Sequence, residues 1–148
     1  MARPSTVPVD GEVVYREEFP AVPSSAPWAR RQAREVLHSR RALPSAIETS
    51  ELLLTEIVTN AIRYGGSQQA GPPGASGEDR ITVTLRYTAG ELLIEVSDSN
   101  QIPPVLAEPD NQAEGWRGLN IVNDLSLAWG YYHLPPSGKA VYCMIAYE

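Results

Sequence analysis

Alternation of apolar and polar residues predicts several strands in this chain. Residues 12–19 alternate loosely, which is typical of an edge strand. Residues 81–87 alternate, and so do 92–96 apart from Leu93, on either side of a short glycine-containing turn, so they predict an antiparallel hairpin with one buried face. Two further strands are predicted over about 129–134 and 139–147, and the second is apolar on both faces, as a central strand would be.

Apolar residues at helical spacing predict three helices. The first spans about 24–41 and is locally basic, which fits either a solvated face or a docking face for an acidic partner. The second spans about 46–64, after Pro44 breaks the first, and Ser45 begins a Ser-x-x-Glu pattern that is typical of a capping box. The third covers about 119–127.

The order of these elements predicts an α+β fold. Strand, helix, helix, two strands, helix and two strands fit a two-layer α/β sandwich, in which one mostly antiparallel mixed sheet carries helices on one face. Residues 65–79 and 99–114 have the composition of long polar loops. We expect 1–11 to be a flexible N-terminus and 12–148 to form a single domain.

Composition narrows the classes of function. The chain has 148 residues, of which 43% are hydrophobic, and 12 basic against 18 acidic residues give a net charge of −6. Because no basic block is present, direct binding to nucleic acid or to an anionic membrane is not expected. No apolar stretch approaches the roughly 20 residues that span a bilayer, and the first residues lack a signal core, so we expect a cytoplasmic protein. Cys143 is the single cysteine, which excludes an intramolecular disulfide.

Three polar side chains share one face of the second predicted helix. Glu56, Asn60 and Arg63 stand at positions i, i+4 and i+7, which at about 100° per residue places them within roughly 60° of each other. Leu54 and Ile57 belong to the apolar stripe on the opposite face. A carboxylate, an amide and a guanidinium on one stripe can hold a metal, a nucleophile and a phosphate. The alternative is an ordinary solvated helix face.

An aspartate at the end of a predicted strand is the second candidate. Asp98 continues the inward face formed by Ile94 and Val96, and a buried carboxylate needs a partner. Two interpretations remain open at this point. Asp98 either caps the following turn or accepts a hydrogen bond from the exocyclic amine of a base.

Two further segments carry candidate phosphate-binding residues. Gly115 and Gly118 precede the third predicted helix, and glycine lets backbone amides approach a ligand closely at a helix N-terminus that favours phosphate. Arg117 lies between them and adds positive charge. Lys139 begins the last predicted strand and is either a turn lysine in solvent or a lysine that reaches toward a phosphate.

Taken in order, four segments resemble the GHKL ATPase superfamily and, within it, the anti-sigma-factor serine kinases. The segments are ELLLTEIVTNAIRYGG, IEVSDSNQIPP, GWRGLNIVNDLSLAWG and SGKAVYCMI, and their order and spacing cover about 15–148. The resemblance implies the histidine-kinase-like ATPase fold with a Bergerat-type ATP site. It also implies ATP and Mg²⁺ as cofactors.

The resemblance assigns roles to individual residues. Asn60 would bind Mg²⁺ through its amide oxygen, Glu56 would orient or deprotonate an attacking serine hydroxyl, and Asp98 would accept from the adenine amine. Gly115 and Gly118 would let a lid close over the triphosphate. Together with the candidates taken from the residues themselves, the expected ATP-binding set is Asn60, Arg63, Asp98, Gly115, Arg117, Gly118 and Lys139, although the resemblance assigns Arg63 no fixed role.

The function implied by the resemblance is that of a serine/threonine kinase that doubles as an anti-sigma factor. Such a protein phosphorylates an anti-anti-sigma protein and binds a sigma factor, so it regulates transcription by partner switching; a homodimer is a further open arrangement. The alternative is a module of the same fold that binds partners with little or no catalysis. Asn100, Glu114 and Ala140 favour this alternative because they depart from the family pattern, with Ala140 at a position where a threonine supports the adenine pocket. A detached sensor-kinase domain is a third interpretation, although His38 lies in no dimerisation motif.

Overall fold

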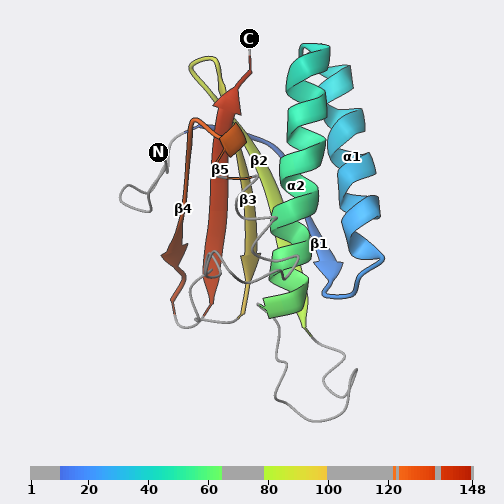
Figure 1. Ribbon diagram of the computed structural model, residues 1–148, viewed down its shortest axis with the longest axis vertical. Helices are drawn as coiled ribbons and strands as arrows, with labels where there is room; N and C mark the ends of the chain where they lie inside the picture. Colours follow the sequence, from blue (N-terminus) through green and yellow to red (C-terminus); the bar gives the residue numbers. More distant parts are fainter. Residues whose placement is uncertain (1–10, 65–78, 100–121, 123, 136–137, 148) are drawn as a thin grey trace.

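The structure, a computed structural model, describes residues 11–64, 79–99, 122, 124–135 and 138–147. Figure 1 shows a sheet with two long helices on one side. The elements, in chain order, are β1 (Glu12–Pro20), α1 (Ser25–Ser39), α2 (Pro44–Tyr64), β2 (Arg80–Thr88), β3 (Glu91–Asp98), β4 (Ala128–His133) and β5 (Lys139–Ala146).

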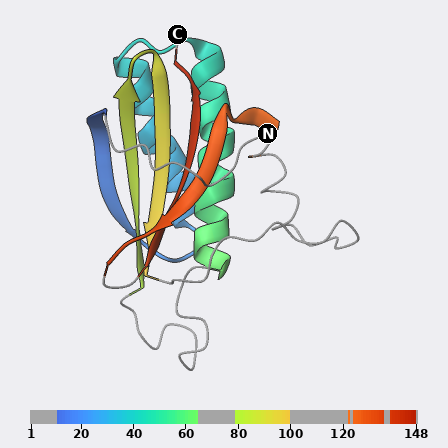
Figure 2. The same cartoon turned by 90° about the vertical axis from the view of Figure 1, so that its left-hand side faces the viewer.

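The five strands form one sheet in the order β1-β2-β3-β5-β4. All four pairings are antiparallel, so the described sheet is antiparallel throughout rather than mixed. The reason is that β4 and β5 form a second antiparallel pair, and that β5 in turn pairs antiparallel with β3. Both α1 and α2 cover the same face (Figure 2), which confirms the predicted two-layer α+β arrangement.

A tight turn fixes the register of the central hairpin. Ala89 and Gly90 both have positive φ, at 45° and 85°, and they join β2 to β3 directly after the Thr88–Glu91 pair. Two residues of positive φ make a turn whose twist matches that of the flanking strands. The predicted antiparallel hairpin is therefore confirmed, with the turn at its predicted place. The prediction of a single buried face is wrong for β3, whose consecutive residues Leu92, Leu93 and Ile94 are all fully buried.

The start of α2 differs from the prediction. The helix begins at Pro44, whose missing N–H costs nothing in the first turn. The carbonyl of Leu43 accepts the first helical hydrogen bond from the amide of Ile47, at 3.0 Å. Ser45 consequently lies inside the first turn, so the prediction of a capping box led by Ser45 is wrong.

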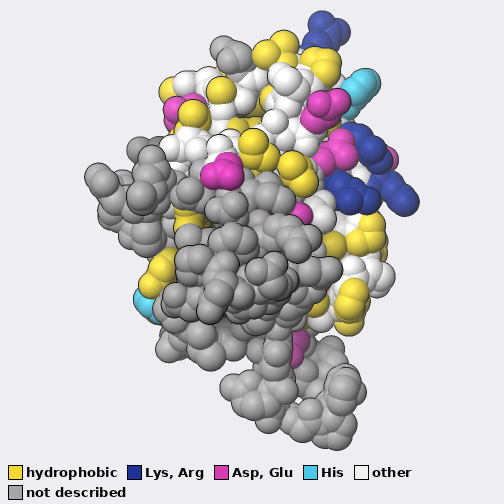
Figure 3. Space-filling view, in the orientation of Figure 1, with side chains coloured by type: hydrophobic (Ala, Val, Ile, Leu, Met, Phe, Trp, Pro, Cys, Tyr) yellow, Lys and Arg dark blue, Asp and Glu magenta, His cyan; other side chains and the backbone are white. Residues whose placement is uncertain are grey.

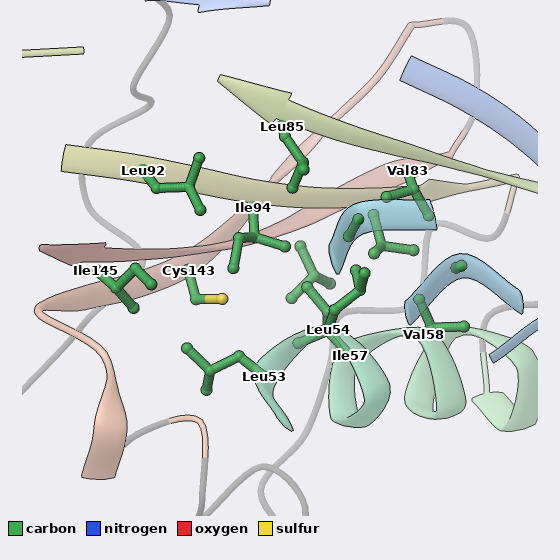
Figure 4. Close-up of a cluster of buried hydrophobic side chains, with 14 of the residues drawn as sticks. Leu53, Leu54, Ile57, Val58, Val83, Leu85, Leu92, Ile94, Cys143 and Ile145 are labelled. Atoms are coloured by element: carbon green, nitrogen blue, oxygen red, sulfur yellow. The ribbon is translucent and has the colours of Figure 1, made fainter. Parts of the chain in front are cut away.

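The core lies between α2 and the inward face of the sheet (Figure 4). It is built from the following labelled side chains: Leu53, Leu54, Ile57, Val58, Val83, Leu85, Leu92, Ile94, Cys143 and Ile145. Each large apolar side chain removed from water in this way contributes roughly 1.5–3 kcal/mol. Cys143 is fully buried, and this burial raises the pKa of its thiol to about 12.

Several predicted segments lie largely outside the described residues. These are the N-terminus, the two long loops and most of the third helix; of the last, residues 122, 124 and 125 are helical. The prediction of a central fifth strand is confirmed, since β5 lies between β3 and β4 and is buried along most of its length.

Candidate functional site

Four segments that are distant in sequence meet at one end of the sandwich. Figure 1 shows the C-terminal end of α2 at the same end as the arrowhead of β3 and the start of β5. Because β3 and β5 are antiparallel, the last residue of β3, Asp98, lies opposite the first residue of β5, Lys139. His133, at the end of β4, is paired with Lys139 on the other side.

The polar stripe of α2 is only partly accessible to solvent. Asn60 is buried, at 9% exposed, and Glu56 is half-buried, so Asn60 does not belong to a solvated face, while for Glu56 the choice between a solvated face and a functional role stays open. Leu54 and Ile57 lie in the core on the opposite side, as the sequence predicts. Arg63 belongs to α2, but its side chain lies outside the described part of the structure.

Asp98 and Lys139 form a buried ion pair. The Lys139 ammonium donates to both carboxylate oxygens of Asp98 at 3.0 Å, and the two side chains are 4% and 2% exposed. Hydrogen bonds between ionised groups are roughly twice as strong as neutral ones. The interpretation of Lys139 as a turn lysine in solvent is therefore wrong, because the strand register places it directly against a buried carboxylate.

A glycine permits this close approach of the two strands. Gly138 has a φ of 110°, a conformation that side-chain-bearing residues rarely adopt. A Cβ added there would lie 2.4 Å from the carbonyl oxygen of Asp98. Sequence reasoning did not identify Gly138 or the partner of Lys139. The available signal was an acidic residue at the end of one buried strand and a lysine at the start of another.

The strand register also corrects the assignment of the position beside the adenine pocket. Ala140 pairs with Ser97, and both side chains alternate to the face opposite Asp98. The residue of β5 that contacts Asp98 is Lys139, one position earlier. The side chain of β5 that bears directly on Asp98 is therefore that of Lys139, whereas Ala140, the departure from the family pattern, lies on the other face.

A second buried ionic group lies on the other face of β3. Glu95 accepts hydrogen bonds from Arg86 at 3.0 Å and from the hydroxyl of Tyr132. Burial, and then the hydrogen bond to Glu95, raise the pKa of Tyr132 well above its ordinary value. Because side chains alternate along a strand, this group is separated from the Asp98 site by the sheet.

A groove of about 440 Å³ lies between α1 and α2, away from these residues. Arg30, Arg31 and Arg34 line it from α1, and Glu48 and Glu51 line it from α2. Figure 3 shows these basic side chains gathered beside acidic ones. Since Arg34 and Glu51 approach to 3.7 Å, the positive charge of α1 is partly compensated, and none of the predicted site residues whose side chains the structure describes lines the groove.

The donor set suits a metal that is carried mainly by a nucleotide. Within the described ranges, no three His, Cys, Asp or Glu side chains are grouped so as to hold a metal ion. Mg²⁺ commonly takes only one or two protein ligands and completes its shell with phosphates and water. The buried amide of Asn60 fits the role of such a single oxygen ligand.

Three predicted site residues lie outside the described part of the chain. They are Gly115, Arg117 and Gly118, and their roles stay predictions, as do those attached to Asn100 and Glu114. Of the described helices, none is long and apolar enough to cross a membrane.

Comparison with known proteins agrees with the resemblance found in the sequence. A search of curated proteins gave no match. A family model described as a histidine kinase-like ATPase domain matches residues 19–144, which is most of the chain and includes the described site residues Glu56, Asn60, Asp98 and Lys139. The chain therefore belongs to the family of histidine kinase-like ATPase domains, within the GHKL group of ATP-binding folds.

Proposed function

We propose that this chain binds ATP with Mg²⁺ and phosphorylates a serine or threonine of an anti-anti-sigma protein, and that it also binds a sigma factor. The observation that carries the proposal is the placement of Glu56 one turn before the buried Asn60, at the end of the sandwich that holds Asp98. The family supports ATP binding, and the pair on α2 supports phosphoryl transfer to a hydroxyl.

Each described residue has a part in binding the nucleotide. Asp98 accepts from the amine of the base at the end of β3. Asn60 would hold Mg²⁺ through its amide oxygen, and the metal would supply charge neutralisation at the phosphates. Arg63 flanks the phosphates from the last turn of α2, together with Arg117 in the glycine segment. Phosphoryl transfer depends mostly on such positioning and charge neutralisation, so few side chains are required.

Glu56 is the proposed general base. Its side chain is half-buried on α2, one turn before Asn60, and in this proposal it faces the hydroxyl of the incoming protein. The serine or threonine oxygen attacks the γ-phosphorus and its proton passes to Glu56, while the bond to the β,γ-bridging oxygen breaks and ADP leaves. The products are the phosphorylated partner and ADP.

Phosphate transfer from labelled ATP to a co-purifying anti-anti-sigma protein tests this proposal. Glu56→Gln should slow transfer by about 100-fold or more while ATP binding is retained, because only the base is lost. Glu51→Gln is the matched control, since Glu51 lies on the same helix and pairs with Arg34 rather than facing the site. Transfer by Glu56→Gln at the wild-type rate would show that Glu56 is not the base.

A second candidate function is partner binding without catalysis. The observation that favours it is the ammonium of Lys139 on both oxygens of Asp98, the carboxylate assigned to the base. Calorimetry with Mg-ATP separates the two candidates. No heat of binding at millimolar nucleotide would favour the module without catalysis, whereas saturable binding together with transfer favours the kinase.

A further inference from the structure

The carboxylate assigned to the base is already bound to a cation. Both oxygens of Asp98 lie 3.0 Å from the Nζ atom of Lys139, and both side chains are almost fully buried. A base amine that approaches Asp98 therefore meets a carboxylate whose charge is compensated. Because charge-assisted bonds are stronger than neutral ones, the neutral amine competes poorly with the ammonium.

The backbone leaves this contact little freedom to open. Asp98 and Lys139 face each other as a register pair, and Gly138 packs directly against the backbone of Asp98. Separation of the two charges consequently requires a movement of the Lys139 side chain rather than of its strand. A base that enters the site meets two groups side by side, an acceptor on Asp98 and a donor on Lys139.

The chemistry of the purine 6-position makes this arrangement specific. A 6-amino purine such as adenine presents a donor, which suits a carboxylate alone. A 6-oxo purine presents an acceptor, which a lone carboxylate repels but an ammonium binds. A site that hydrogen-bonds one polar group of its ligand can reject the analogue lacking it by a large factor, and a mixed acceptor and donor pair removes that rejection.

We propose that Lys139 is the base-specificity residue of this site: it weakens ATP binding and admits 6-oxopurine nucleotides. The inference rests on the proposed nucleotide site at Asp98. The two proposals make different demands on the data. Binding of ATP would support the nucleotide site, but by itself it would neither support nor contradict the role of Lys139 in base specificity. The quantity that tests it is the ratio of the dissociation constants for ITP and ATP.

The experiment measures Mg-ATP and Mg-ITP binding by calorimetry for the wild type, Lys139→Met and Lys139→Thr. The wild type should bind ITP within about tenfold of ATP. Both substitutions should tighten ATP and weaken ITP, by about tenfold each, since the carboxylate of Asp98 is then released from the ammonium and can accept from the amine of adenine. Lys139→Thr is included because its hydroxyl can donate to Asp98, which keeps the fold intact if the methionine variant unfolds.

Arg86→Met is the matched control. It also breaks a buried ion pair made with β3, but on the opposite face of the sheet, so it should leave the ITP to ATP ratio unchanged. Thermal unfolding of each variant identifies any loss of fold. A ratio that changes equally in Arg86→Met and Lys139→Thr would show a general loosening of the sheet and would overturn the inference.

The remaining outcomes separate this inference from the proposed function. A wild type that binds ATP but rejects ITP by about 1,000-fold or more overturns the role of Lys139 and leaves the ATP site standing. Weaker ATP binding in Lys139→Thr also overturns it, because Lys139 would then assist the nucleotide. A wild type and variants that bind neither nucleotide at millimolar concentration overturn both proposals.

Discussion

Lys139→Met should strongly destabilise the fold. The substitution keeps an unbranched side chain but removes the charge that Asp98 binds through both oxygens at 3.0 Å. Because the two side chains are at most 4% exposed, water cannot replace the lost ammonium. Breaking a buried pair in this way costs about 3–5 kcal/mol of the free energy of unfolding, within a total of about 5–15 kcal/mol for a typical domain.

Arg80→Met is the control that isolates the effect of burial. Arg80 and Glu18 join β2 to β1 at the same distance of 3.0 Å, but their side chains are 48% and 62% exposed. Exposed pairs of this kind contribute about 1 kcal/mol or less. The double variant Asp98→Leu with Lys139→Met should recover much of the loss, because two apolar side chains need no solvation there.

Urea unfolding, followed by tryptophan fluorescence and far-UV circular dichroism, gives the free energy of each variant. Added salt should reduce the small effect of Arg80→Met and leave that of Lys139→Met nearly unchanged, because buried pairs are screened less than exposed ones. Equal losses for Lys139→Met and Arg80→Met would refute the reasoning from burial. So would a loss below about 1 kcal/mol for Lys139→Met.

Three further predictions concern the backbone and the core. Gly138→Ala should lower the melting temperature in a thermal scan, because its Cβ would lie 2.4 Å from the Asp98 carbonyl oxygen; an unchanged melting temperature would contradict the close approach. Ala89→Gly should stabilise the hairpin by about 0.5–1 kcal/mol in urea titrations, since position 89 has a φ of 45°. The thiol of Cys143 should resist a thiol reagent in the native state. Its pKa is raised from 9.0 to about 12, so on raising the pH the thiol loses its proton in the unfolded chain before it does so in the native state. The free energy of unfolding should therefore fall as the pH rises from about 9 to about 12. Cys143→Ala should remove that part of the pH dependence.

Local patterns in the sequence predicted the helices and strands better than they predicted the contacts between them. Alternation located the hairpin of β2 and β3, and the apolar stripe of α2 identified the helix face that enters the core. The stripe also identified Glu56 and Asn60, because both follow from helical periodicity alone. The predictions of the hairpin and of the buried helix face succeed since each depends on neighbours within a few residues along the chain, whereas the roles of Glu56 and Asn60 stay predictions.

The contact of Lys139 with Asp98 could not be predicted in the same way. It depends on the register between β3 and β5, which pair across 41 residues of sequence. Because side chains alternate, an error of one residue moves every side chain to the other face. The assignment of position 140 to the adenine pocket was such an error. The prediction for the start of α2 failed for a different reason. Proline is favoured in the first turn of a helix, so Pro44 begins α2, whereas it was interpreted only as the residue that ends the preceding helix.

The two buried ion pairs of β3 also fix how this strand aligns with its neighbours. β3 is the middle strand of the sheet and carries Glu95 on one face and Asp98 on the other. If it slipped by one residue against β2 and β5, Glu95 would enter the apolar core and Asp98 would leave its lysine. Uniformly apolar strands allow such slips at modest cost, whereas here a slip of one residue buries an uncompensated charge. The central strand therefore selects one register during folding through the same charges that shape the site.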